Sequence, residues 1–195
     1  MQIINIKSHL EIIKDVDIIK TIKISVLCIV LTFSFSFVAN ANYTSEEFQQ
    51  SFFKIGYKGI YEALDENNKH FKQSIALPVQ LPSITFTHGF GRFSNLDGES
   101  NDKLEINYLN KDVPQNHYKI FVQPVKYGLE FREDLIDQRL KTKDGNEALY
   151  STKAVRDFNL LVFKKNEFQY ILSVDKRISD KVTPELLVEI ADSIS

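Results

Sequence analysis

The stretch of sequence that decides the fold reads DFNLLVFKKNEFQYILSV and spans residues 157–174. Two apolar runs flank a polar middle at Lys165 and Asn166. In the second run apolar side chains recur at every other position, which is the period of a β-strand with one buried face. The stretch therefore predicts a β-hairpin that turns near Lys165 and Asn166. The residues predicted to share one face are Phe168, Tyr170, Leu172 and Val174.

Upstream, the same period of two recurs in short segments. They are KLEINYLN (103–110), HYKIFVQP (117–124) and NEALYSTK (146–153), the last after a predicted turn at Asp144 and Gly145. The connections between these segments are too short for the crossovers that parallel strands need, so the strands are predicted to be antiparallel. Before them, IALPVQLPSI contains Pro78 and Pro82, which exclude a helix and predict an extended segment at a sheet edge.

Helices are predicted at both ends of this region. Thr44 and Glu47 have the spacing of a capping box, and apolar residues from Phe48 to Leu64 recur at roughly helical intervals. They predict one helix running toward His70 that Gly56 and Gly59 weaken or kink. At the other end, Thr183, Pro184 and Glu185 form a helix start, and ELLVEIADSI (185–194) carries one apolar stripe.

The predicted fold class is therefore α+β, with an antiparallel sheet of about five to seven strands packed with N- and C-terminal helices. Three parts of the chain are expected: a signal peptide or signal anchor at 1–41, a helical segment at 42–75, and the sheet with its closing helix at 76–195. The last two parts are expected to form one domain, because their combined length suits a single hydrophobic core.

The N-terminal prediction rests on the order of three features. Lys20 and Lys23 precede an apolar run at 24–38, which holds 15 residues without a charge. Ala39 and Ala41 then give the small-x-small pattern that signal peptidase cleaves after. Because a bilayer crossing needs about 20 apolar residues, the short run favours cleavage before Asn42.

Two alternatives remain for this region, because the segment before the apolar run, residues 1–23, is unusually long for a signal peptide. This segment also contains three acidic residues, Glu11, Asp15 and Asp17. One is a start codon assigned too far upstream. The other is an uncleaved anchor, in which case the protein contacts the membrane only through residues 1–41. In both cases everything after Ala41 is exported, so a secreted or cell-surface location is expected.

Composition excludes several kinds of site. The formal net charge is −2, which argues against nucleic acid as a partner because nucleic-acid binding requires a basic patch. Cys28 is the only cysteine and lies inside the apolar run, so the mature chain is expected to lack disulfides, cysteine nucleophiles and cysteine-bound metals. The spacing of His70, His88 and His117 fits no metal motif.

The segment TFTHGFGRFSN, residues 85–95, is the strongest candidate for a site. No helix start follows it that would make a phosphate loop, and no G-x-S-x-G motif accompanies it. Alternation from Ile84 to Arg92 predicts a strand instead, in which the glycines relieve crowding or allow a bulge. The residues predicted to contact a ligand are His88, Phe90 and Arg92; no catalytic residue, metal ligand or cofactor is predicted.

The segments LPVQLPSITF, LEINYLN, YKIFVQP, LLVFKKNEFQYILSV and VTPELLVEIADSIS together resemble an uncharacterised exported domain of Gram-positive bacteria. That domain often forms the extracytoplasmic part of anti-sigma-factor-like or sporulation-related membrane proteins. The resemblance covers about residues 77–195 and implies no catalytic residues. No sigma-binding or zinc-binding segment precedes the apolar run, so the resemblance extends to the outer domain alone.

Three functions are compatible with these features. The first is an exported, non-enzymatic domain that binds a ligand or protein partner outside the cytoplasmic membrane. The second is a carrier or sensor of hydrophobic molecules, which would require an apolar cavity of about a few hundred Å3. The third is an extracellular hydrolase, which would bring His88, Arg92 and an acidic residue together in one cleft.

Overall fold

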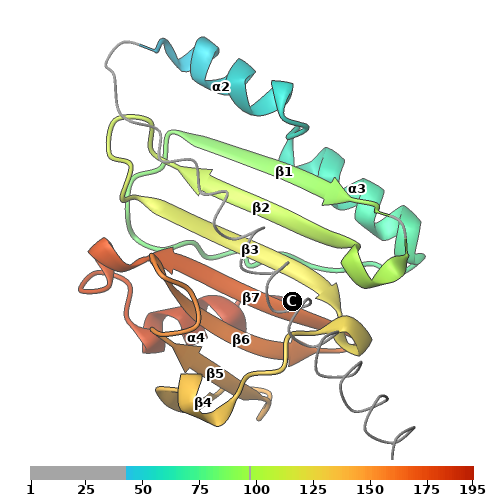
Figure 1. The fold of residues 1–195 in the computed structure, drawn as a ribbon, viewed down its shortest axis with the longest axis vertical. Helices are drawn as coiled ribbons and strands as arrows, with labels where there is room; N and C mark the ends of the chain where they lie inside the picture. The colour runs from blue at the N-terminus through green and yellow to red at the C-terminus, as the bar shows by residue number, and fades with distance from the viewer. Residues whose placement is uncertain (1–42, 97) are drawn as a thin grey trace, which may run out of the picture. The chain divides into compact units, whose positions relative to one another are not determined.

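A computed structural model describes residues 43–96 and 98–195 of the chain. The predicted signal peptide, its cleavage residues Ala39 and Ala41, and Cys28 lie outside the described residues. Residues 42–195 form one compact unit, in which three helices and a seven-stranded sheet are described. The α+β prediction is confirmed (Figure 1).

All strand pairs in the sheet are antiparallel, and the spatial order is β1-β2-β3-β7-β6-β5-β4. The strands are β1 (His88–Ser94), β2 (Lys103–Leu109), β3 (His117–Pro124), β4 (Gln138–Lys141), β5 (Glu147–Ser151), β6 (Phe158–Lys165) and β7 (Phe168–Asp175). Short 3-10 turns lie at Glu99–Asn101, Val125–Tyr127, Glu133–Leu135 and Lys176–Ile178.

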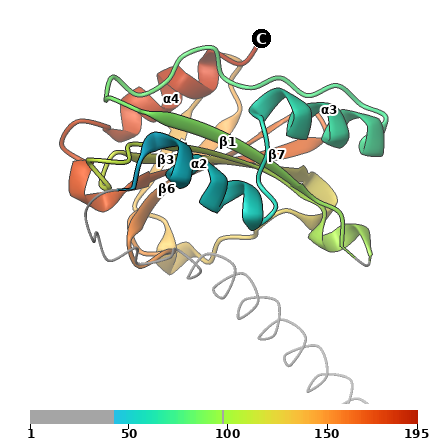
Figure 2. The same cartoon turned by 90° about the horizontal axis from the view of Figure 1, so that it is seen from above.

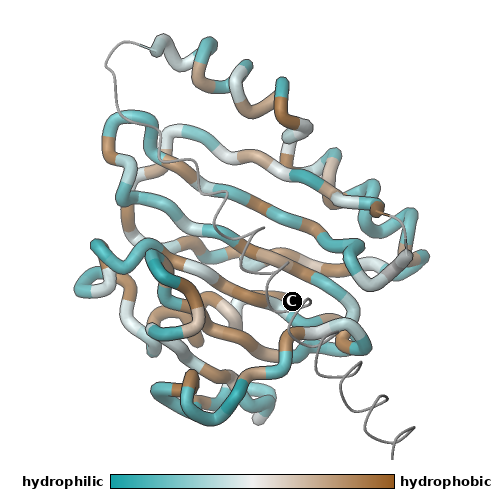
Figure 3. Tube along the Cα trace, viewed as in Figure 1, coloured by the Kyte–Doolittle hydropathy of each residue, from teal (hydrophilic) through white to brown (hydrophobic). Residues whose placement is uncertain are grey.

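The predicted hairpin forms the middle of the sheet. It consists of β6 and β7 and turns at Asn166, whose φ of 54° is the left-handed conformation that asparagine tolerates. All eight residues of β7 are buried, because β7 has a strand on each side and packed layers on both faces. Figure 3 shows hydrophobic residues running along this central pair. The predicted face from Phe168 to Val174 belongs to the main core.

One long connection departs from a simple meander. After β3 the chain does not pair with its next strand but crosses to the far edge, where β4 pairs with β5. The connection passes over β7 and β5: the backbone of Leu129 exchanges hydrogen bonds with the Gln169 side chain, and Ser151 donates to the carbonyl of Leu135. Neither this crossover nor β4 was predicted, because β4 has only four residues and carries Arg139 and Lys141.

The helices are α2 (Ser45–Lys54), α3 (Ile60–Phe71) and α4 (Pro184–Asp192). The capping box at Thr44 and Glu47 and the cap at Thr183 are present as predicted. The prediction of one continuous helix from α2 to His70 is wrong. Gly56 has a φ of 89°, which ends α2, and the chain restarts as a separate helix after Gly59.

The two N-terminal helices pack on opposite faces of β1. The Phe52 ring in α2 stacks on Phe90, with ring centroids 4.3 Å apart. Gly91, the next residue of β1, instead faces Ala63 in α3. Because successive strand residues point to opposite faces, α2 and α3 must lie on different sides of the sheet. Helix α4 lies on the α3 side, as Figure 2 shows.

The proline-containing segment is not an edge strand, which corrects the prediction. No strand is assigned to residues 75–87, and the segment instead crosses the face that α3 and α4 cover (Figure 2). Tyr170 in β7 donates to the carbonyl of Ala76, and Gln80 donates its N–H to Ser193 after α4. The predicted strand through Ile84 starts only at His88, because Ile84 and Phe86 pack into the core on this side.

We expect Gly91→Ala to lower the free energy of unfolding by about 1–3 kcal/mol, the usual cost of overpacking. A Cβ at Gly91 would lie 2.7 Å from the Ala63 Cβ and 3.0 Å from the Ile60 Cα, neither of which can move without shifting α3. Gly89→Ala is the matched control, since its nearest neighbour is the mobile end of the Ile60 side chain. Urea denaturation of both variants measures the difference; equal stabilities would contradict close packing of α3.

Candidate functional site

Six polar residues form a linked group on the sheet face opposite α3 and α4. In register, Arg92 of β1 lies beside Glu105 of β2, and Asn107 of β2 lies beside Lys119 of β3. They alternate with core residues such as Ile106 and Ile120, whose side chains point to the other face. We call the group the polar cluster; its members are Tyr57, Arg92, Glu105, Asn107, His117 and Lys119.

Tyr57 enters the cluster from the link between α2 and α3. Lys58 and Gly91 exchange backbone hydrogen bonds of 2.8 and 2.9 Å, so the link runs alongside β1. This pairing sets Tyr57 beside Arg92, whose guanidinium carbon lies 4.4 Å from the centre of the tyrosine ring. A break between the two helices is therefore needed to complete the cluster.

Glu105 is the acceptor at the centre of the cluster. Its carboxylate accepts hydrogen bonds from Arg92 Nη2 at 2.6 Å, from the Tyr57 hydroxyl at 2.6 Å and from Asn107 Nδ2 at 2.8 Å. Burial acts to raise the pKa of Glu105, but the Arg92 charge and the hydrogen bond from Tyr57 outweigh it, so the pKa lies below its ordinary value. Glu105 is thus a buried carboxylate that stays ionised.

The neighbouring Tyr57 hydroxyl stays protonated. Burial and, after it, the Glu105 charge raise the pKa of Tyr57 far above its ordinary value of 10.0. The hydroxyl also accepts a hydrogen bond of 3.1 Å from Asn107 Nδ2. Tyr57 therefore orients the carboxylate of Glu105 and does not compete with it for positive charge.

His117 is neutral in this environment. Its Nε2 lies 3.1 Å from Asn107 Oδ1, and because an amide oxygen only accepts, Nε2 carries the proton. Burial, followed by the charges of Lys119 and Arg177, holds the pKa of His117 well below 6.5. The imidazole packs edge-on against Phe158, with centroids 5.2 Å apart.

Lys119 is the member with the fewest contacts. The residue is 8% exposed, and its Nζ lies 4.9 Å from the centre of the Phe158 ring. No hydrogen bond or ion pair joins Nζ to any residue of 43–96 or 98–195. Burial lowers the pKa of Lys119 below its ordinary value; the Glu105 charge opposes this shift and the Arg92 charge adds to it.

The three residues predicted to contact a ligand share one strand face, but only Arg92 belongs to the cluster. Phe90 is buried against α2. His88 bonds to the Thr87 hydroxyl at 2.7 Å and to the Ser45 carbonyl at 3.2 Å. The side chain of His88 thus fastens α2 to β1, and the combination of His88, Arg92 and an acid is not formed.

Sequence reasoning missed the other five members of the cluster. A signal was present, because Glu105 and Asn107 in one strand, and His117 and Lys119 in the next, occupy the positions between the apolar residues. On an exposed face such residues would be ordinary solvated positions. Only the pairing of β1, β2 and β3 brings them together with Tyr57.

The remaining histidine is paired elsewhere: His70 Nε2 lies 2.9 Å from Asp102 Oδ2. Among residues 43–96 and 98–195, no three histidine, cysteine, aspartate or glutamate residues converge as metal ligands would. Within the same ranges, no helix combines the length and hydrophobicity of a membrane span.

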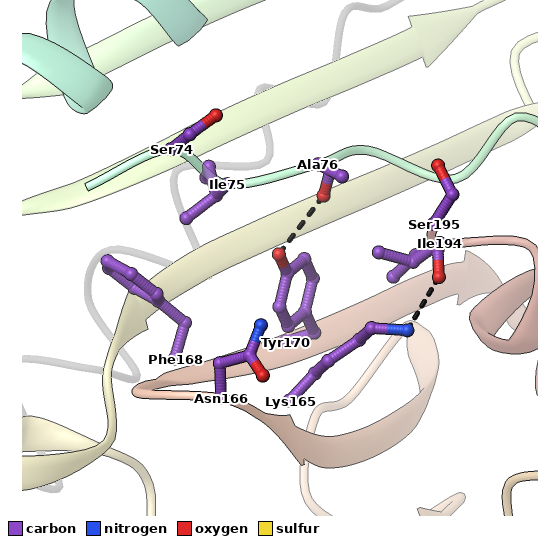
Figure 4. A pocket seen from close by; sticks show the side chains of 9 residues that line it. All are labelled: Ser74, Ile75, Ala76, Lys165, Asn166, Phe168, Tyr170, Ile194 and Ser195. Carbon is purple, nitrogen blue, oxygen red and sulfur yellow. Dashed lines mark hydrogen bonds between the residues drawn. The ribbon is translucent and has the colours of Figure 1, made fainter. Parts of the chain in front are cut away.

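A small pocket lies away from the polar cluster, beside the C-terminus (Figure 4). Its volume is about 130 Å3, below the roughly 300–1,000 Å3 of ordinary ligand sites. Tyr170 donates to the carbonyl of Ala76 and Lys165 donates to the carbonyl of Ile194 across it. These contacts fasten the chain end and the proline-containing segment to the β6–β7 hairpin, which is a structural role.

No family model, no curated protein and no solved structure matches this chain. The resemblance to the outer domain of anti-sigma-factor-like proteins therefore stays a prediction.

Proposed function

We propose that the chain after Ala41 is an exported domain that binds a ligand or protein partner outside the cytoplasmic membrane, with the polar cluster as its binding site. The export half of this proposal rests on the charge, apolar run and small residues at positions 20–41. The binding half rests on the geometry of the cluster.

A single observation supports the proposed binding function. Charged side chains are buried on a sheet face where apolar residues would make the protein more stable. Glu105 is 5% exposed and Lys119 is 8% exposed, while Phe121 and Ile171 beside them are buried and apolar. Replacing buried ion pairs by apolar residues is often neutral or stabilising by about 1–4 kcal/mol. Sites that depart from the locally most stable choice are typically functional.

The chemistry of the cluster favours binding over catalysis. The one hydroxyl group in it, that of Tyr57, donates to Glu105 and has a raised pKa, so it is a poor nucleophile. Glu105 already accepts three hydrogen bonds, and the proton of His117 is engaged by Asn107. The hydrolase alternative requires His88, Arg92 and an acidic residue in one cleft, whereas His88 lies outside the cluster and bonds to the Thr87 hydroxyl and the Ser45 carbonyl.

The alternative of a carrier for hydrophobic molecules has less support. It requires an apolar cavity of about a few hundred Å3, whereas the pocket at the C-terminus is about 130 Å3 and is crossed by polar contacts. The polar cluster would also be an unusual lining for a purely apolar ligand, because each buried polar group would lose access to water.

Export is tested by expressing the full chain with a C-terminal tag in a Gram-positive host. We expect the protein in the medium or the cell envelope, with Asn42 as its first residue if the signal is cleaved. Recovery from the cytosol with Met1 attached and no membrane association would contradict the proposal. Replacing Ala39 and Ala41 by bulky residues is the matched control, since it should block cleavage without touching the domain.

Binding is tested on the same exported protein by cross-linking at the cell surface and mass spectrometry. A Lys119→Met variant serves for comparison, because it removes a charge of the cluster that has no acceptor among the described residues and keeps the length of the side chain. A captured ligand or partner that is lost in this variant would support the polar cluster as the site. Equal capture by both proteins would place binding elsewhere.

A further inference from the structure

The polar cluster contains two cationic side chains with donors that lack an acceptor among the described residues. Arg92 Nε is buried and has no hydrogen-bond partner, although Nη2 of the same guanidinium reaches Glu105. Lys119 Nζ has an aromatic ring beside it and no hydrogen-bond acceptor among the described residues. Native proteins pair more than about nine in ten of their buried polar groups, so the orphan at Arg92 Nε requires an explanation, and Lys119 Nζ beside the same Glu105 is free to take a ligand.

The acceptors of the cluster are already in use. One oxygen of Glu105 accepts from Tyr57 and Asn107, and the other accepts from Arg92. Asn107 lies directly opposite Lys119 in the sheet, but its Oδ1 accepts from His117. Each of these oxygens thus has a donor already, and none of them accepts a hydrogen bond from Lys119.

The cluster also carries more positive than negative charge. Arg92 and Lys119 carry two positive charges against the one negative charge of Glu105, and half-buried Lys103 on the same face adds a third. Burial lowers the pKa of both Lys119 and Lys103, and repulsion from the Arg92 charge lowers each pKa further. An added anion would relieve this repulsion and supply the missing acceptors at once.

We propose that Lys119 and Arg92 bind a carboxylate group, with Lys119 Nζ and the partly exposed guanidinium of Arg92 as its donors. This inference rests on the proposed binding function and names the chemistry of the ligand. The two donors stand on β3 and β1, on either side of the strand that carries Glu105 and Asn107. With the carboxylate bound, the two positive charges of Arg92 and Lys119 face two negative charges, those of Glu105 and the ligand.

A carboxylate fits better than a phosphate for two reasons. A carboxylate carries a single negative charge and is therefore repelled less by the nearby ionised Glu105 than a phosphate dianion would be. The donors also border apolar rings, since Phe158 lies under Lys119 and Phe121 lies between Glu105 and Ile171 in the sheet. The carboxylate comes either from a small organic acid or from an acidic side chain of a protein partner.

The test uses the protein purified after expression of the full chain, in the form that the cell produces. Backbone 15N spectra are recorded during titration with sodium propionate, with the peptide Gly-Glu-Gly amidated at its C-terminus, and with inorganic phosphate. We expect saturable shifts at Lys119 and Asn107 with propionate or with the peptide. A response to propionate indicates a small organic acid, and a response to the peptide alone indicates a protein side chain.

Lys119→Met should weaken binding of the responding probe by roughly 10- to 100-fold, because one charge-assisted hydrogen bond is lost. The variant should fold normally, since a methionine removes a buried charge and keeps the length of the side chain. Lys164→Met is the matched control: Lys164 is exposed on the same sheet face, and its removal should leave affinity unchanged.

Three results would overturn the inference: no saturable response to either carboxylate probe, a tighter response to phosphate, or equal affinity in Lys119→Met. These outcomes are separate from failure of the proposed function. An exported protein that captures a partner without a carboxylate would keep the function and reject the inference. A cytosolic protein that binds propionate through Lys119 would keep the inference and reject export.

Discussion

Glu105→Ala is expected to lower the free energy of unfolding by about 3–5 kcal/mol, the usual result of removing one partner from a buried ion pair. The substitution leaves the partly buried Arg92 and the buried Lys119 without the carboxylate between them and takes the acceptor from Tyr57 and Asn107. The loss is measured by urea denaturation at neutral pH. A loss below 1 kcal/mol would show that Glu105 is not held as an ionised, buried acceptor.

The pH dependence gives this prediction an independent check. Because the pKa of Glu105 is lower in the folded protein than its ordinary value of 4.5, the ionised carboxylate stabilises the fold fully above that pH. The stabilisation is lost as the pH falls through the lowered pKa. The difference between the wild type and Glu105→Ala should therefore shrink on acidification below pH 4.5; a difference that grows instead would have the wrong sign.

Two further variants separate the buried pair from its surroundings. In the double variant Arg92→Met with Glu105→Leu, part of the lost stability should return, because Arg92 no longer remains without its anion, while Lys119, Tyr57 and Asn107 still lack Glu105. Glu147→Ala is the surface control: Glu147 bonds to Arg139 at 2.6 Å, but both side chains are about half exposed. Its removal should cost no more than about 1 kcal/mol.

Leu172→Ala is the second substitution with a large expected effect, a loss of about 2–5 kcal/mol. Leu172 is fully buried in the central strand β7, between Ile120 of β3 and Leu161 of β6. The neighbouring strands are fixed by hydrogen bonds on both sides, so the space left by the leucine cannot close easily. The same denaturation experiment measures the loss, with thermal unfolding as a second readout.

Val79→Ala is the matched control for this variant. Val79 is also apolar, but it is 81% exposed in the proline-containing segment, so its truncation should change stability by no more than about 0.5 kcal/mol. A loss at Leu172 no larger than that at Val79 would contradict the central position of β7. Retained propionate binding in Leu172→Ala would show that the core and the polar cluster are separate features.

The contrast between the two faces of the sheet shows how far sequence reasoning reached. Apolar residues in alternation, such as Leu104 and Ile106, predicted strands whose buried faces the structure confirms. The spacing of those residues follows from burial of one strand face away from water, and it can be recognised within each strand without knowing the neighbouring strands. The polar residues between them, such as Glu105 and Asn107, looked like solvated positions because their neighbours across the sheet were unknown.

The helices show the same division. Thr44 and Thr183 mark helix starts through hydrogen bonds within four residues, so the sequence predicts them reliably. Gly56 did not show by itself whether it bends a helix or ends one. The helix ends at this point because Phe52 packs on one face of β1 and Ala63 packs on the other. Both contacts join segments that are far apart in the chain.

The sequence by itself determined the strands of the central hairpin, the helix caps and the α+β class, because hydrophobic alternation and capping act between residues close in the chain. Only the tertiary structure decided the order of the strands, the split of the N-terminal helices and the polar cluster. Each of these features depends on which distant segments pair, because the free energy of pairing comes from contacts between two segments and not from either segment alone. The arrangement of Arg92, Glu105 and Lys119 on three adjacent strands is the outcome with the greatest consequence for function.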